Sequence, residues 1–471
     1  MGHTGFVYTS EQARLLALAE RHGYGIYLGM RNDEARFSAP EHGVLVLGPP
    51  RCGKTSAIVV PNVLASCGSV VSTSTKPDVL QITSLPRSYM GECLLFDPSG
   101  TVECPPWVRR IAWSPLGPAT SWDGAVRVAD AMVRAARPGT DRGEGAHWSE
   151  RAGALLAAAF HAGAVDKMPF PDVMQAIDRR EVGRFQRPLA KENLSLPQSA
   201  LASVLATEAR EQSGIWSTAS GVLAGYRTEK ALASSHGDVL DAARFVRETS
   251  TLYICAGSDS QRLAGSLVAG VITQLRSEAY EMNRDAVTAG RRGYGPPMLL
   301  ALDEVANIAP LHDLPNMVAE GGSQGVVTLA CFQDLSQARA RWGNEADGFL
   351  STFQSKLVFP GIGDTRSLEM ISVLVGELDL KHSSTTTSPA WTALLGQRPL
   401  ASTTESTRRL RRLPVDEIAR GHKGNVLHLD GTTPTTLGAR PWYEDRDLRA
   451  IVGAERFAER VSERGRPAIS R

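Results

Sequence analysis

Short apolar runs alternate with longer amphipathic stretches along most of the chain. The run 44–47, VLVL, is short and wholly apolar, which is typical of a parallel strand buried on both faces. A glycine-rich turn and an apolar helical stretch follow it, and further apolar runs come at 68–75 and 92–97. This strand–loop–helix–strand order predicts an α/β fold with a mainly parallel sheet. Pro61 should kink or end the first helix, because proline lacks an N–H and clashes with the preceding turn.

The periodicity changes near residue 115, where apolar residues begin to recur every three or four positions. We expect an all-α insertion there, after which strand-like runs return. The later runs lie at 250–257, 298–304, 325–333, 356–361 and 425–431. The predicted organisation is an N-terminal helix and strand (1–42), the first part of the α/β domain (43–118), the helical insertion (119–246), the second part of the α/β domain (247–450) and a charged tail (451–471).

One segment has little periodicity of either kind. Residues 380–407 are rich in Ser and Thr, and this composition predicts a mobile loop. The densest basic cluster follows directly, in STRRLRRL. Its arginines could contact a polyanion, and a solvated face is the alternative; they are Arg408, Arg409, Arg411 and Arg412.

The turn after the first apolar run matches the phosphate-binding pattern G-x-x-x-x-G-K-[ST]. In such a turn, successive backbone N–H groups point inward and form a nest for anions at a helix N-terminus. Lys54 would reach the β and γ phosphates, and Thr55 would ligate Mg²⁺. A chance match on a surface turn is the alternative, and the strand before the turn and the helix after it argue against that. The predicted cradle comprises Gly48, Pro49, Pro50, Arg51, Cys52, Gly53, Lys54, Thr55 and Ser56.

A second motif joins an apolar run to two carboxylates, in MLLALDE. A buried strand that ends in Asp303 and Glu304 has the Walker B arrangement. Asp303 would hold the magnesium, and Glu304 would polarise the attacking water, as in-line phosphoryl transfer requires. Acidic residues that cap the next helix are the alternative. The second carboxylate favours hydrolysis over transfer to a small acceptor.

Polar residues also follow two other predicted strands. Gln333 ends the strand after Walker B, where its amide could bond the γ-phosphate or the lytic water; a surface glutamine is the alternative. Lys76 and Asp78 follow the strand beside the phosphate loop, at the edge where ligands bind in open α/β sheets. A structural salt bridge between these two residues is the alternative.

The composition is that of a globular protein with balanced acidic and basic residues. The chain has 471 residues, 42% hydrophobic and 21% charged, with a net charge of +1. Any polyanion contact must therefore come from a local patch or an assembled ring. The six cysteines show no C-x-x-C spacing, and no stretch reaches the roughly 18 apolar residues of a membrane span. These features predict a cytoplasmic protein.

The order and spacing of the longer blocks resemble the VirD4/TraG/TraD coupling ATPases of conjugative type IV secretion. The blocks are GPPRCGKTSAIVVPNVL, VVSTSTKPDVL, LLFDPSG and LLALDEVANIAPLHDLPNMVAEGGSQGVVTLACFQDLSQARARWG. The resemblance covers about residues 20 to 450 and is most specific in the last block. It implies a RecA-like motor of the FtsK/HerA branch that binds ATP and Mg²⁺ and acts as a ring, a hexamer. It also implies that the ring recruits a relaxase complex with single-stranded DNA, or effector proteins, for the secretion channel.

Two features depart from the family pattern. Family members usually begin with a membrane anchor, and none is seen here, so we expect either a soluble member or a chain that a separate membrane protein docks at the inner face of the membrane. The family often reads G-R-x-x-G after Walker B, with an arginine that acts in trans on the neighbouring subunit's ATP. Here Gly322 occupies that position. The candidate replacements are Arg339, Arg341 and Arg366.

Two other functions remain open at this point. The chain could be an ATP-gated recruitment platform in which hydrolysis only switches conformation, and the missing arginine favours that reading. A nucleotide kinase or a GTPase fits less well, because no guanine-reading N-K-x-D is present and the Asp–Glu pair suits hydrolysis.

Overall fold

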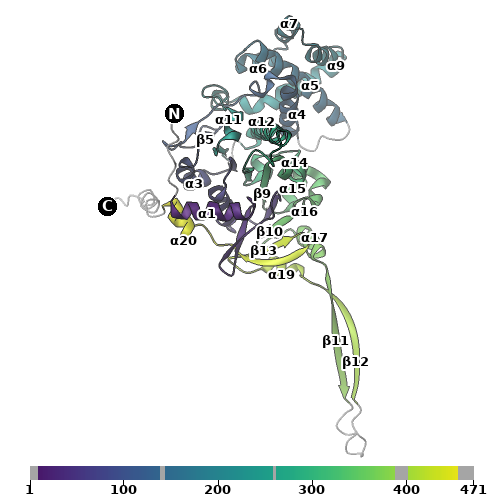
Figure 1. The fold of residues 1–471 in the computed structure, drawn as a ribbon. Coiled ribbons are helices and arrows are strands. Elements are labelled where there is room, and N and C mark those ends of the chain that lie inside the picture. The colour runs from purple at the N-terminus through teal and green to yellow at the C-terminus, as the bar shows by residue number, and fades with distance from the viewer. Residues whose placement is uncertain (1–8, 138–143, 258–260, 388–400, 454–471) are drawn as a thin grey trace, which may run out of the picture.

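A large mixed sheet runs through the molecule (Figure 1). The computed structural model describes residues 9–137, 144–257, 261–387 and 401–453. Within these residues the main sheet has 12 strands in the order β2-β1-β14-β13-β10-β3-β9-β8-β4-β7-β5-β6. The strands from β10 to β6 are parallel, and the others are antiparallel. The predicted α/β fold with a mainly parallel sheet is therefore confirmed.

All the parallel strands except the two-residue strand Arg109–Arg110 overlap a predicted apolar run. The parallel strands are β3 (Val44–Leu47), β4 (Val70–Ser74), β5 (Cys93–Phe96), β6 (Arg109–Arg110), β7 (Thr251–Cys255), β8 (Met298–Leu302), β9 (Val326–Phe332) and β10 (Ser355–Val358). The antiparallel strands extend the sheet at the β10 edge. They are β1 (Tyr27–Arg31), β2 (Glu34–Phe37), β13 (Asn425–Asp430) and β14 (Thr433–Gly438). Of these, β2 and β14 were not anticipated, because their residues are mostly half-exposed and carry little apolar signal.

Helices cover both faces of the sheet, and the side chains of the strands contribute to an apolar core on each face. Val44 and Val46 of β3 belong to one core, whereas Leu45 and Leu47 belong to the other, as the two-residue period of a strand requires. The first core is covered by α1 (Ser10–Arg21), α2 (Val60–Ala65), α3 (Asp78–Ser88) and α20 (Arg446–Val452). The second is covered by α12 (Gln261–Thr288), α13 (Val305–Ile308), α14 (Leu314–Glu320), α15 (Leu335–Trp342), α16 (Phe349–Thr352), α17 (Thr365–Val375) and α19 (Val415–Arg420).

Between β6 and β7 the described chain is almost entirely helical. Its helices gather at the end of the molecule away from α1 and α20, and α4 packs against α12 (Figure 1). They are α4 (Trp122–Ala136), α5 (Glu144–Val165), α6 (Phe170–Asp178), α7 (Gly183–Lys191), α8 (Ser195–Leu205), α9 (Ala209–Val222), α10 (Glu229–Ala233) and α11 (Ala242–Arg247), with short 3₁₀ turns at Pro118–Thr120 and Leu223–Tyr226. The exact domain boundaries remain a prediction.

Of the two outcomes predicted for Pro61, a kink or an end of the first helix, the second does not occur. The helix opens with a π-type turn, Thr55–Val59, and continues as α2 to Ala65. The Val60 N–H bonds to the Thr55 carbonyl, so the hydrogen-bond register changes just before Pro61. The N–H that proline lacks therefore falls where the backbone hydrogen bonds change from the π to the α pattern. The helix continues beyond Pro61 for this reason.

The Ser/Thr-rich segment is also different from the prediction. Instead of a mobile loop, β11 (Glu377–Thr387) and β12 (Ala401–Arg411) form a second, two-stranded antiparallel sheet. It pairs from Glu377 opposite Arg411 to Thr387 opposite Ala401 and projects away from the body (Figure 1). Threonine is β-branched and favours strands, which the composition argument overlooked. Residues 388–400, and most of the predicted charged tail (454–471), lie outside the described residues.

A buried lysine in the central sheet makes stability depend on pH. Lys356 of β10 is 1% exposed, and its Nζ donates to the carbonyls of Leu350 (2.9 Å) and Phe353 (2.8 Å) at the end of α16. Burial lowers the pKa of Lys356 to about 8, although the charge of Asp430 opposes this shift. Between about pH 8 and pH 10.5, the ordinary pKa of lysine, the unfolded chain therefore keeps a proton that the folded chain has released.

We expect the free energy of unfolding to rise with pH through this window, because the unfolded state binds more protons there. Urea unfolding of the wild type and of Lys356→Met, between about pH 7 and about pH 9.5, isolates the effect from other titrating groups. The difference between the two proteins should shift in favour of the wild type as pH rises. A difference that stays constant would contradict the low pKa.

Candidate nucleotide-binding site

The phosphate loop lies near the middle of the sheet. It follows β3, which lies between β10 and β9, and so opens at the carboxyl edge of the parallel strands. Gly53 has φ +100°, in the region that favours glycine, and its carbonyl starts the helix by accepting from the Ala57 N–H at 2.8 Å. At Gly48 an added Cβ would lie 2.7 Å from Phe359 Cβ and from Cys52 Sγ. Both glycines of the motif are thus required by the backbone or by packing.

Lys54 and Thr55 begin the helix and face the turn and the neighbouring strand. The Lys54 ammonium, 9% exposed, donates to the carbonyl of Pro49 at 3.0 Å and also to that of Gly48. The Thr55 hydroxyl donates to Asp303 Oδ2 at 2.6 Å. The two motifs are 248 residues apart in sequence, and this hydrogen bond brings them together.

Asp303 is the buried carboxylate of this site. It follows β8 and is 5% exposed, and its backbone is bonded to Thr73 of β4 in both directions, at 3.3 Å each. Burial raises the pKa of Asp303, whereas the Thr55 hydroxyl and the Lys54 charge act to lower it. A carboxylate and a hydroxyl are hard oxygen donors, so the donor set suits Mg²⁺.

Glu304 lies beside Asp303 in an unusual backbone conformation. Its φ is +51° and its ψ is +47°, which is left-handed and uncommon for a residue with a side chain. Its carboxylate accepts a long hydrogen bond of 3.4 Å from Asn307 Nδ2 on α13. The alternative role for Glu304 is to cap the helix that follows. Glu304 does precede α13, but its side chain makes no capping hydrogen bond.

Gln333 follows β9, the strand between β3 and β8. Its backbone N–H donates to the Gln337 side-chain oxygen at 3.0 Å. Because neighbouring parallel strands end at one edge, Gln333 belongs to the same edge as the phosphate loop and Asp303. Lys76 and Asp78 follow β4 at this edge as well. Both are exposed, and within the described residues no ion pair joins them.

Sequence reasoning missed two supporting residues, Thr73 and Asn307. Thr73 is the next-to-last residue of β4 and bonds to the Asp303 backbone, and Asn307 donates to the Glu304 carboxylate. The only signal available was position: Thr73 lies near the end of an apolar run, and Asn307 lies one helical turn after Glu304.

The position of the family's trans-acting arginine has no room for a side chain. A Cβ added to Gly322 would lie 2.1 Å from the Glu41 carbonyl oxygen. Among the three candidate replacements, Arg339 is 17% exposed and bridges two carboxylates, whereas Arg366 is 60% exposed and pairs with Asp347 at 2.5 Å. Within the basic cluster, Arg409 pairs with Glu377 and Asp379, so part of that charge is neutralised.

The sheet order, the phosphate loop and the two carboxylates define a P-loop nucleotide-binding protein with a helical insertion. The family model described as "Type IV secretory system Conjugative DNA transfer" matches residues 7–464. The chain therefore belongs to this family, and the resemblance to conjugative coupling ATPases is confirmed.

Relatives and solved structures agree with this assignment. A conjugal transfer protein TraG of Escherichia coli is 24% identical over 488 residues, covering 93% of this chain and 74% of that protein. A TraG of Agrobacterium fabrum is 28% identical over 40% of this chain and 27% of its own length.

The solved bacterial conjugative coupling protein TrwBdeltaN70 shares the fold, with a TM-score of 0.67 at 15% identity over 90% of each chain. TrwB in complex with ADP and Mg²⁺ gives 0.63 at 16% identity, over 85% of each chain. Both similarities confirm the predicted RecA-like fold. No helix in the described ranges is long and apolar enough to cross a membrane.

Proposed function

We propose that the chain is an ATP-hydrolysing coupling protein that recruits a relaxase–DNA complex, or protein substrates, and drives their transfer through a type IV secretion channel. The observation that carries the proposal is the hydrogen bond of 2.6 Å between Thr55 and Asp303. It joins the phosphate loop to the acid pair, as a site that holds nucleotide and metal together requires.

Each residue of the site has a role in this proposal. The backbone from Gly48 to Ser56 holds the phosphates of ATP, and Lys54 leaves its two carbonyl partners to contact the β and γ phosphates. Glu304 accepts a proton from the attacking water, and Gln333 orients that water or the γ-phosphate. Thr55 and Asp303 would hold Mg²⁺, which neutralises charge on the transferring phosphate.

The proposed assembly is a ring, a hexamer, with ATP between subunits. A ring would place a cation of one subunit beside the ATP of the next, and because position 322 is a glycine, another residue or a partner would have to supply that cation. Arg366 is better placed than Arg339 to reach a neighbouring subunit, because its side chain is 60% exposed, whereas that of Arg339 is 17% exposed and held by two carboxylates. For localisation we propose a cytoplasmic protein held at the inner face of the membrane by a separate partner.

The test is the rate of ATP hydrolysis against protein concentration, with and without single-stranded DNA. A motor whose sites form between subunits should show a specific activity that rises steeply with concentration and a severalfold stimulation by DNA. A rate that is independent of both would contradict the translocating function. Hydrolysis stimulated by a relaxase but not by DNA would instead indicate a recruitment platform.

Cys52 gives a direct probe of the phosphate loop. The thiol is half-buried within the loop, and burial raises its pKa, although Lys54 opposes the shift. We expect Mg-ATP to slow alkylation of Cys52 by about tenfold or more, because bound phosphates cover the turn. Mass spectrometry measures the labelling, and Cys67, which is also half-buried but outside the loop, is the internal control. Equal labelling of Cys52 with and without Mg-ATP would count against the cradle.

A further inference from the structure

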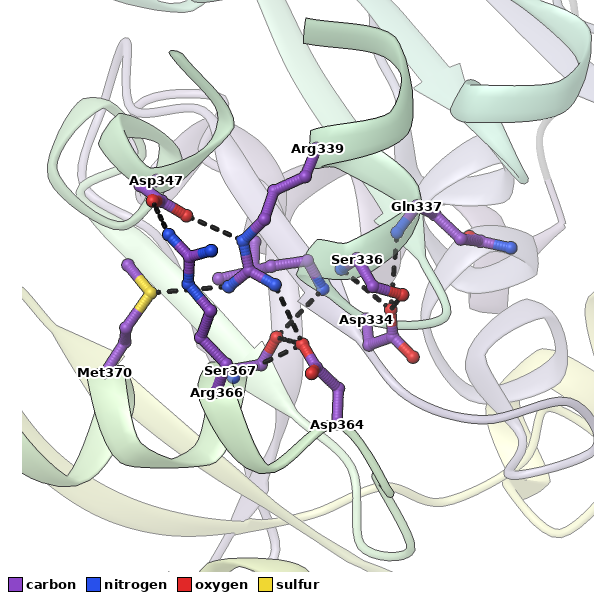
Figure 2. A network of polar contacts seen from close by, with 10 residues as sticks. Asp334, Ser336, Gln337, Arg339, Asp347, Asp364, Arg366, Ser367 and Met370 are labelled. Carbon is purple, nitrogen blue, oxygen red and sulfur yellow. Dashed lines mark hydrogen bonds and ion pairs between the residues drawn. The ribbon is translucent and has the colours of Figure 1, made fainter. Parts of the chain in front are cut away.

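A polar network joins the helix that follows Gln333 to the helix that leads into the hairpin (Figure 2). Its centre is Arg339 on α15. The Arg339 guanidinium donates from Nε to Asp347 Oδ1 at 2.8 Å and from Nη1 to Asp364 Oδ2 at 3.1 Å. A planar fork held between two carboxylates fixes its orientation as well as its position.

The Asp364 end of the network anchors the start of α17. Asp364 caps that helix by accepting from the Ser367 N–H at 3.3 Å and from the Ser367 hydroxyl. The same hydroxyl, fully buried, accepts from the Leu335 N–H at 3.2 Å. The first residue of α15 is thus bonded to the first turn of α17, and Arg339 makes a second connection one turn later.

The other end of the network reaches Gln333, which the proposed function places beside the γ-phosphate or the lytic water. Gln333 lies two residues before Leu335, and its N–H is bonded to the Gln337 side chain at 3.0 Å. Asp334 caps α15 through the N–H groups of Ser336 (2.9 Å) and Gln337 (3.3 Å), as Figure 2 shows. These hydrogen bonds couple the position of the Gln333 turn to that of α15.

The far end of α17 holds both strands of the hairpin. Helix α17 ends at Val375, and β11 begins at Glu377 after Gly376. The Gly376 carbonyl accepts from the Arg412 N–H at 3.0 Å, just after β12. The Ser372 hydroxyl also donates to the Leu413 carbonyl at 2.6 Å. A displacement of α17 would consequently move the base of the whole hairpin.

We propose that Arg339 is a positioning residue: it fixes α15 to α17, and so holds Gln333 in place for hydrolysis and passes its movement to the hairpin. This inference rests on the proposed function, because it presumes that Gln333 contacts the γ-phosphate or the lytic water. It also gives Arg339 a role within its own subunit, since its guanidinium is already engaged by two carboxylates and does not reach a neighbour's ATP.

The test compares Arg339→Gln with Asp364→Asn, which cut the same connection from opposite ends. Each should lower kcat for ATP about tenfold and leave KM within about twofold, because the phosphate loop is untouched and only alignment is lost. The double variant should be much less impaired than the product of the two single effects, since both changes break the Arg339–Asp364 ion pair. Arg339→Lys should recover only part of the rate, because an ammonium cannot form the fork.

A matched control separates alignment from general destabilisation. Arg109 also bridges two carboxylates, Glu92 and Asp238, and it lies at the β5–β6 end of the sheet. Arg109→Gln should lower the melting temperature and leave kcat and KM unchanged. If Arg339→Gln behaves in the same way, with reduced stability and unchanged kcat, the positioning role is overturned.

Hydrogen exchange supplies a readout that does not depend on turnover. ATP should change exchange at Gly376 and Arg412 in the wild type, and Arg339→Gln should abolish that change while the phosphate loop stays protected. A change at Gly376 and Arg412 that persists in Arg339→Gln would overturn the connection. Absence of phosphate-loop protection in the wild type would instead refute the proposed function, so the two failures are distinguishable.

Discussion

Glu304→Gln should bind ATP as the wild type does and hydrolyse it about 10²- to 10⁴-fold more slowly, the usual contribution of a general base. The glutamine keeps the size of the side chain and can still accept from Asn307 Nδ2, so the local geometry is preserved. What is lost is the ability to take a proton from water. The variant should therefore accumulate as an ATP-bound species, and a ring that forms on ATP binding should become more stable.

The measurement is single-turnover hydrolysis together with ATP affinity by filter binding or calorimetry. Glu320→Gln is the matched control, because Glu320 is an exposed carboxylate on α14, after the same strand. It should hydrolyse ATP at the wild-type rate. Should Glu304→Gln turn over ATP as fast as this control, the base must be sought elsewhere, and the left-handed backbone at Glu304 would need another explanation.

The parts of the site that could be predicted from sequence are those whose chemistry is local. Gly48, Gly53, Lys54 and Thr55 act through one turn, and that turn has a fixed residue pattern. Asp303 follows an apolar strand, and the bond from Thr55 brings the motifs together as expected. A buried strand, a turn and a terminal carboxylate are each visible within about ten residues of chain, so their identification needed no tertiary information.

The parts that could not be predicted depend on residues far apart in sequence or on weak patterns. The crowding at Gly322 comes from Glu41, on a turn before β3. The role of Arg339 depends on Asp347 and Asp364, and nothing in RARWG separates an arginine held between two carboxylates from any other. The hairpin was missed for a different reason: Ser and Thr carry no apolar period, and the strand preference of threonine alone does not show which two segments pair.

Gly322→Arg should destabilise the protein and should not restore a trans-acting arginine. Even the Cβ of the new side chain would lie 2.1 Å from the Glu41 carbonyl oxygen and 2.6 Å from Glu41 Cβ. The obstacle is largely backbone and cannot swing away as a flexible side chain would. Either the turn at Glu41 or the 3₁₀ turn Gly322–Gln324 must move, at a cost of about 1–3 kcal/mol or more of unfolding free energy.

The smaller change Gly322→Ala tests the crowding without adding charge. It should cost about 1–3 kcal/mol in urea unfolding, and Gly153→Ala in α5 should instead be neutral or stabilising by up to about 1 kcal/mol. At Gly153 an added Cβ meets nothing within 4 Å, so the control gains helix propensity at no steric cost.

Both outcomes bear on how the ATPase site is completed. If Gly322→Arg folds with wild-type stability and accelerates hydrolysis, the turn at Glu41 yields easily, and the family's arginine site is intact apart from the side chain. If it destabilises the fold as expected, the chain has filled that site with its own backbone. In the proposed ring, the cation would then come from another residue of the neighbouring subunit or from a partner, because the charge that develops on the phosphate during hydrolysis still requires one for a fast rate.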